Sequence, residues 1–86
     1  MAGMTVGAED VRRLLAAESA DAVLVLIEGR VEVVAPADLE SPDYRGALQI
    51  ATREDVVQRT GGAELSDREV AEQAEDLDSA VRNLGG

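Results

Sequence analysis

The apolar residues near the start of the chain follow a helical spacing. From Ala8 to Leu15 they recur at intervals of three and four residues, which places them on one face of a helix. Gly7 suits the N-cap position, and Glu9-Asp10 falls in the first turn, where the helix dipole favours negative charge. We therefore predict a helix to about Glu18, with an apolar stripe that a sheet or another helix must cover.

The middle of the chain has the pattern of three strands. Ala22–Ile27 is continuous, apolar and β-branched, so we predict a central strand that is buried on both faces. Glu28-Gly29 is a candidate hairpin turn. Apolar and charged residues alternate in Arg30–Ala35, which indicates a returning strand with one solvent-exposed face. Pro36–Asp43 contains two prolines and is expected to be a loop with at most one short turn. Tyr44–Ala51 alternates again and is the predicted third strand.

Two capping signatures mark helix starts in the second half of the chain. Thr52 and Asp55 form an acidic variant of the capping box, and this short helix is expected to end at Gly61-Gly62. Ser66–Glu69 reads S-D-R-E, which is the standard S-x-x-E box. We therefore predict a long helix over Asp67–Asn83.

The order of these elements predicts an α+β fold. It consists of a small three-stranded, mainly antiparallel sheet with an N-terminal helix, a short helix and a long C-terminal helix, and the helices lie mostly on one face. Residues 1–86 form one domain, in which 1–5 and 85–86 are expected to be flexible. The third strand pairs with either the first or the second. The last helix carries an apolar seam, which we interpret as one side of the core, with contact to a second helix as the alternative. The seam residues are Val70, Ala74, Leu77, Val81 and Leu84.

The composition restricts the possible chemistry. The chain has no Cys, His, Trp, Phe or Lys, and therefore lacks the commonest general base, the thiol and amine nucleophiles and the nitrogen and sulfur metal ligands. Acid–base catalysis by two carboxyl groups needs them in different environments within a cleft. Paired acids such as Glu54-Asp55 instead lie next to each other on one helical turn. Asp76-x-Asp78 lacks the loop of a calcium site. We expect no enzymatic activity, no catalytic residues, no metal site and no cofactor.

The chain is strongly acidic. Its 18 Asp and Glu residues against 8 Arg give a net charge of -10, which repels phosphate backbones and anionic lipids. We therefore expect neither direct nucleic-acid binding nor membrane binding. The lack of Cys and the polar N-terminal region argue against a secretory signal, so a cytoplasmic location is expected. Such a composition is also typical of high-GC bacteria and of halophiles.

These observations favour a non-catalytic interaction or regulatory module that acts through an acidic helix face or a sheet edge. Its partner is a protein, basic or a second copy of the chain in a homodimer. A second hypothesis is an acidic inhibitor, antitoxin-like or nucleic-acid-mimicking, that binds a basic protein. The contact residues expected in both cases are the exposed acids of the last helix: Glu69, Glu72, Glu75 and Asp76.

The sequence ends in Gly85-Gly86, which supports a third hypothesis. A terminal glycine pair is typical of ubiquitin-like sulfur carriers, and this resemblance implies a C-terminus that an adenylating enzyme activates at Gly85 and Gly86. The same family has a β-grasp fold that ends in a strand before its glycines. The capped helix predicted here differs from that pattern, and glycine after a helix is also an ordinary stop signal.

Overall fold

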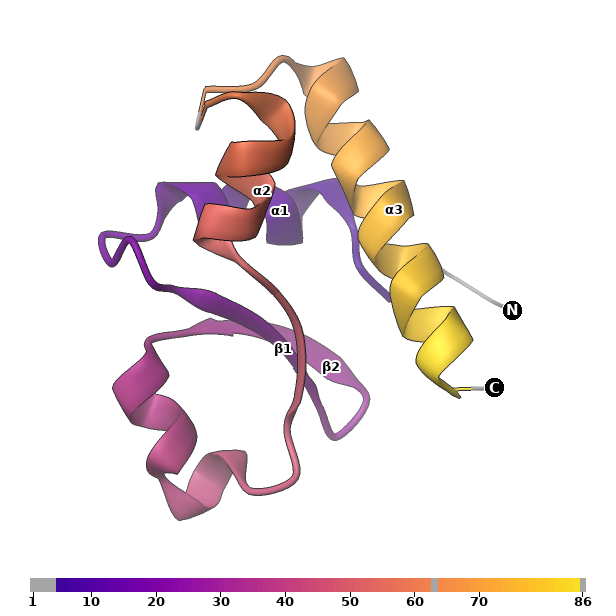
Figure 1. Ribbon diagram of the computed structural model, residues 1–86. Helices are drawn as coiled ribbons and strands as arrows, with labels where there is room; N and C mark the ends of the chain where they lie inside the picture. Colours follow the sequence, from indigo (N-terminus) through magenta and orange to yellow (C-terminus); the bar gives the residue numbers. More distant parts are fainter. Residues whose placement is uncertain (1–4, 63, 86) are drawn as a thin grey trace.

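The computed structural model describes residues 5–62 and 64–85 and has an α+β fold (Figure 1). The ends predicted to be flexible are residues 1–5 and 85–86. Most of these residues, 1–4 and 86, lie outside the described residues. Two short 3-10 helices, η1 and η2, connect the second strand to the third. The elements in chain order are α1 (Ala8–Ala16), β1 (Val23–Ile27), β2 (Arg30–Val34), η1 (Pro36–Glu40), η2 (Pro42–Tyr44), β3 (Leu48–Thr52), α2 (Arg53–Thr60) and α3 (Asp67–Gly85).

The sheet has the order β2-β1-β3, and both strand pairs are antiparallel. This order confirms β1 as the central strand and shows that the third strand pairs with the first. The β1–β2 hairpin closes through Glu28-Gly29, where φ is +51° and +79°. Two successive left-handed residues form the primed turn whose twist matches that of the flanking strands.

β1 is buried on both faces, and different parts of the chain cover the two. Leu24 belongs to the main core, which the three helices complete. Val23 and Val25 face the other way and form a second cluster with Val34. Leu39 and Tyr44 of the η segment, which we define as Pro36–Tyr44, pack against this cluster together with Ala47. Figure 1 shows the helices on one side of the sheet and the 3-10 helices on the other. The expectation that helices cover one face is confirmed, and the η segment closes the second face.

The apolar seam of α3 packs into the main core of the same chain. Val70, Ala74, Leu77 and Val81 are each at most 8% exposed. The side chain of Leu84 lies outside the described residues. The core interpretation of the seam is therefore confirmed, and these four residues are not available for contact with a second helix.

The third strand begins later than predicted. Tyr44 lies in η2 rather than in β3, and Gly46, with φ +85°, interrupts the extended chain before Leu48. A β-bulge follows inside the strand, because Leu24 pairs with Ala51 while Val25 pairs with Gln49. The extra residue, Ile50, packs against the main core beside Ala51. Simple alternation placed these two residues on opposite faces, and the bulge overrides it.

Four other boundaries differ from the prediction, and one of them is the end of α3, which continues to Gly85 rather than ending at Asn83. α1 ends at Ala16, two residues before Glu18, because Ala17 leaves the helical region with ψ 140°. β1 and β2 are each one residue shorter than predicted. The connection after β2 contains two 3-10 turns, each starting at a proline, where at most one turn was expected. Both capped helices begin as predicted, and Gly61, with φ +86°, ends α2.

One acid of α3, Asp78, is buried, although a charged residue of this helix is expected on the outer face with the other acids. Asp78 is 4% exposed, and its Oδ1 accepts hydrogen bonds from the backbone N–H groups of Thr5 at 2.6 Å and Val6 at 3.0 Å. Its Oδ2 lies 3.3 Å from Nε of Arg82. Buried carboxylates need such partners. Asp78 therefore fastens the segment before α1 to the last helix.

We predict that Asp78→Asn lowers the free energy of unfolding by about 1.5–3 kcal/mol, because it weakens hydrogen bonds to a charged acceptor and removes the contact with Arg82. Asp76→Asn is the matched control, since Asp76 is exposed on the same helix, and its effect is expected to stay within about 0.5 kcal/mol. Urea unfolding measures both. Equal effects of the two substitutions contradict the anchoring role.

The positive φ of Glu28 generates a second prediction. Asparagine adopts the left-handed region more readily than glutamate, so Glu28→Asn is expected to stabilise the protein by about 0.5 kcal/mol. Glu28→Gln is the control, because it removes the same charge without changing the backbone preference. Thermal unfolding compares the two, and a Gln variant as stable as the Asn variant argues against turn strain.

Candidate functional site

The four acids predicted as contact residues lie on the outer face of α3. All four are exposed. With 3.6 residues per turn, they occupy an arc of about 120° and a length of about 10 Å, nearly opposite the buried seam. We call this set the α3 acidic face: Glu69, Glu72, Glu75 and Asp76.

These acids differ in their partners. Glu69 completes the capping box: its Oε1 accepts from the N–H of Ser66 at 3.0 Å, and this hydrogen bond lowers the pKa of the Glu69 carboxyl. Glu72 lies 3.6 Å from Arg68, but both side chains are exposed, so the pair contributes little. Within the described residues, Glu75 and Asp76 form no ion pair and no side-chain hydrogen bond.

Apart from Glu69, the acids of the α3 acidic face do not stabilise the fold. Glu69 and Glu72 are three residues apart, and Glu72 and Asp76 are four apart, so like charges are neighbours along the helix surface. Each such pair costs an isolated helix about 0.2–0.5 kcal/mol. Only Glu69 has a structural role, in the cap. Glu75 and Asp76, and also Glu72, whose ion pair with Arg68 is exposed and weak, can contact another molecule.

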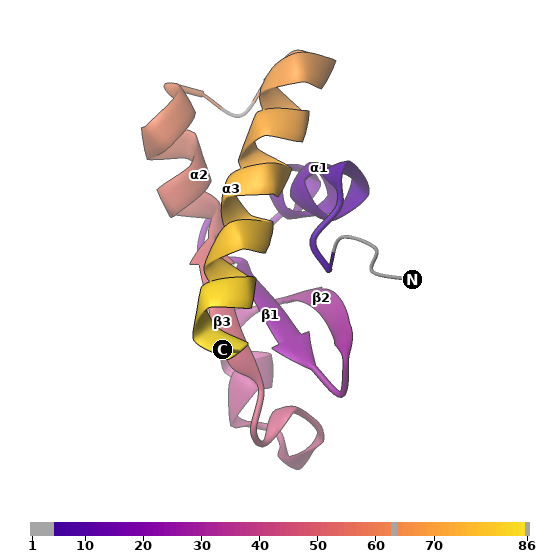
Figure 2. The same ribbon diagram turned by 90° about the vertical axis from the view of Figure 1, so that its right-hand side faces the viewer.

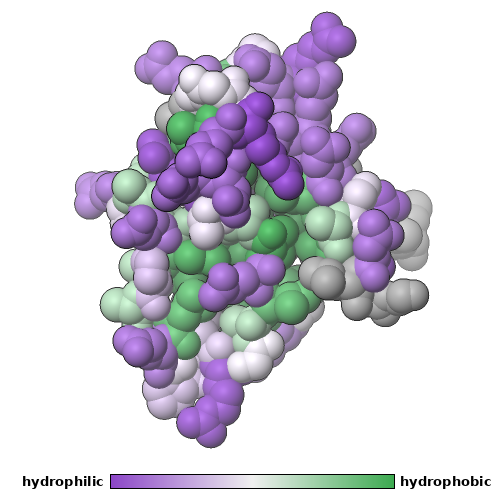
Figure 3. Space-filling model, viewed as in Figure 1, coloured by the Kyte–Doolittle hydropathy of each residue, from purple (hydrophilic) through white to green (hydrophobic). Residues whose placement is uncertain are grey.

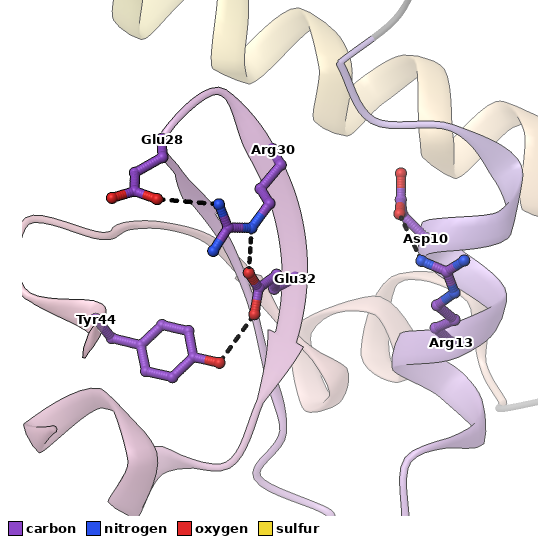
Figure 4. A network of polar contacts seen from close by, with 6 residues as sticks. All are labelled: Asp10, Arg13, Glu28, Arg30, Glu32 and Tyr44. Atoms are coloured by element: carbon purple, nitrogen blue, oxygen red, sulfur yellow. Dashed lines mark hydrogen bonds and ion pairs between the residues drawn. The ribbon is translucent and has the colours of Figure 1, made fainter.

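A second polar cluster lies on the sheet face that the η segment covers (Figure 4). Arg30 in β2 contacts both Glu28 and Glu32, and the hydroxyl of Tyr44 donates to Glu32 at 2.8 Å. Hydrogen bonds from Arg30 and Tyr44 lower the pKa of Glu32, and donation to Glu32 raises the pKa of Tyr44. This network holds η2 against β2. The alternation of the sequence places Tyr44 in a strand and therefore does not reveal this network.

Figure 4 also shows a separate contact on α1, where Arg13 lies 3.7 Å from Asp10. Asp10 itself accepts from the N–H of Gly7 at 2.9 Å and thereby caps the helix. Both contacts are local to the first turns of α1. They explain the acids at this helix start and indicate no ligand.

An open groove of about 390 Å³ lies between α1 and the start of α3. It contains one arginine and one glutamate beside four apolar residues, and Arg12 is already bonded to Asp67. This lining has no paired acid and base and no nucleophile, so it offers no catalytic arrangement. The lining residues are Arg12, Leu15, Ala16, Glu64, Leu65 and Val70.

The exposed apolar surface gathers around β3. Figure 3 shows hydrophobic surface between the helices and the η segment, with hydrophilic side chains dense above it. Leu48 in β3 is 41% exposed, and its neighbours Ile50 and Ala47 are partly buried. The bulge next to Gln49 interrupts this edge, which limits continuous pairing with another strand.

Neither a metal site nor a membrane span stands out in the part of the chain that the structure describes. Residues 5–62 and 64–85 contain no group of three or more potential metal-binding side chains. Over the same residues, no helix combines the length and the apolar character that a bilayer crossing requires. α3 continues to Gly85, while Gly86 lies outside the described residues, so activation at the terminal glycines stays a prediction.

Comparison of the chain with family models, curated proteins and solved structures finds no match.

The Glu32 network predicts a pH dependence. A carboxyl whose pKa is lowered in the folded state adds stability that is complete above its ordinary pKa of about 4.3 and is lost as the pH falls through the lowered value. Tyr44→Phe removes one of the hydrogen bonds that lower this pKa. The variant should be less stable than the wild type above about pH 5, and the difference should shrink towards pH 3.

Urea unfolding between about pH 3 and pH 8 tests this expectation, followed by circular dichroism because Tyr44 is the only aromatic residue. This range avoids ionisation of the phenol, whose pKa is raised. A difference that stays constant over the whole range shows that Tyr44 acts through packing against Val25 and Val34 and not through the ionised Glu32.

Proposed function

We propose that the protein is a non-catalytic binding module that docks onto a basic protein through the α3 acidic face. The observation that carries the proposal is the position of Glu72, Glu75 and Asp76: they are exposed, close together and without a structural role in the fold. Their mutual repulsion is unfavourable in the free protein. A cationic partner surface relieves that repulsion and gains attraction at the same time.

The rest of the charge distribution supports a basic rather than an acidic partner. With a net charge of -10, the whole molecule attracts cationic surfaces over distances of about a Debye length. Several arginines are engaged with acids of the same chain, as Arg12 is with Asp67 and Arg30 with Glu32. Such attraction mainly raises the association rate and excludes anionic partners.

A charge-neutralising variant tests the proposal. In Glu72→Gln/Glu75→Gln/Asp76→Asn, three charges of the α3 acidic face are removed, and Glu69 is kept because it caps the helix. The matched control is Glu18→Gln/Asp21→Asn/Glu40→Gln, which removes the same three charges at exposed positions elsewhere. Each protein is used to capture partners from its source cells, and the purified partner is then titrated calorimetrically.

We expect the wild type and the control to bind one basic protein with affinities within about threefold of each other, and the α3 variant to bind at least about tenfold more weakly. Raising the salt concentration should weaken wild-type binding steeply. Equal binding by the two variants contradicts the assigned face. Competition by duplex DNA for the same partner would place the protein among nucleic-acid mimics.

A further inference from the structure

The outer edge of β2 is the more regular of the two sheet edges. β3 carries a bulge at Ile50 and continues directly into α2, and both features interrupt a hydrogen-bond ladder. β2 pairs with β1 over five consecutive residues without a bulge. Figure 2 shows no other described helix or strand beside its outer side. β2 is therefore the edge that is suited to pairing with another strand.

The register of the sheet identifies the backbone groups that point outwards. The C=O of Ala22 accepts from the N–H of Arg53 at 2.8 Å, on the β3 side of β1. The backbone N–H and C=O groups of successive residues in a strand point to opposite sides, so those of Ala22 point towards β3 and those of Val25 towards β2. The register partner of Val25 is Glu32, whose N–H and C=O groups therefore point back towards β1. Two residues of β2 therefore direct their N–H and C=O groups out of the sheet: Val31 and Val33.

The side chains of β2 distinguish the ways in which two copies can pair antiparallel about a two-fold axis. With Glu32 on the axis, the two Glu32 carboxylates lie opposite each other, which is unfavourable. With Val31 on the axis, Arg30 lies opposite Glu32 of the partner subunit, once on each side of the axis. Arg30 and Glu32 share one face of the sheet, so these cross-strand pairs are attractive.

The surroundings of β2 also favour the axis at Val31. If Val33 lay on the axis, the end of β2 would lie against the partner subunit. This is the end at which the chain turns at Pro36 into η1. Val31 is closer to the Glu28-Gly29 turn, which lies at the other end of β2, away from η1 (Figure 1). With Val31 on the axis, Val33 and Val34 lie opposite Gly29 and Glu28 of the partner subunit, so the paired segment ends before Pro36.

We infer that two copies of the chain pair antiparallel through β2, with Val31 on the two-fold axis. The N–H of Val31 donates to the C=O of Val31 of the partner subunit, and the reverse bond completes the pair. Arg30, already bonded to Glu32 of its own chain, lies between that carboxylate and Glu32 of the partner subunit. This interface goes beyond the proposed function, because it uses a different element and a different partner.

Sedimentation equilibrium between about 10 µM and 1 mM protein tests the inference. We expect the mass to rise from 9.0 kDa towards twice that value. Arg30→Glu replaces two attractive pairs by two repulsive ones and should weaken self-association at least about tenfold. Arg45→Glu makes the same charge change at an exposed site outside the sheet and should change it by less than about threefold.

The charge swap Arg30→Glu/Glu32→Arg separates this register from others. With Val31 on the axis, the swapped charges again lie opposite one another, so self-association should return to within about threefold of the wild type. Circular dichroism first shows that each variant is folded. If the swap variant self-associates as weakly as the Arg30→Glu variant, the cross-strand pairs do not form and the inference fails.

Single cysteines locate the axis directly, since the chain has none of its own. Val31→Cys places two thiols on a hydrogen-bonded pair with Cα atoms about 5.5 Å apart, within the range of a disulfide. Val33→Cys places them more than about 10 Å apart in the same register. Oxidation should therefore cross-link only the first variant. Cross-linking through Val33→Cys instead, or a monomer at every concentration, overturns the inference.

Discussion

The structure depends on the burial of β1 on both faces. Val23 and Val25 point to one side of the sheet and Leu24 to the other, and all three are at most 4% exposed. A strand of this kind needs a cover on each face, and the chain has no Phe or Trp to supply one with few residues. Three helices close the side of Leu24. The η segment, with Leu39 and Tyr44, closes the other and is part of the core rather than a linker.

The helix boundaries in the second half were predictable because their signals are local. The Thr52 and Asp55 side chains each bond to the backbone of the other, and Ser66 and Glu69 do the same. Each capping box needs only residues three positions apart, which a sequence shows directly. Gly61 likewise ends α2 through its own backbone conformation. The exposure of the α3 acidic face follows from the same helical period that buries the seam.

The features that were missed depend on contacts between distant parts of the chain. Asp78 is charged, as residues on the outer face of a helix usually are. Its burial depends on hydrogen bonds from the backbone N–H groups of Thr5 and Val6, more than 70 positions away. Tyr44 has the alternation of a strand residue, and its position in η2 results from packing under β1 and bonding to Glu32. Local patterns do not contain these pairings. For the same reason, the sequence pattern indicated the structural role of Glu69, through its capping box, but not that of Asp78.

The two proposed surfaces lie on different elements, α3 and the edge of β2, so neither uses residues of the other. Two copies joined through β2 present two acidic faces, which gives a basic partner with two sites a gain in avidity. Salt acts differently on the two contacts. It screens the attraction between the α3 acidic face and a cationic surface. Between two copies it screens the Arg30–Glu32 pairs across β2 but also relieves the long-range repulsion between two chains of charge -10. The dimer, which also has backbone hydrogen bonds, is therefore expected to depend less steeply on salt than the complex with a basic partner.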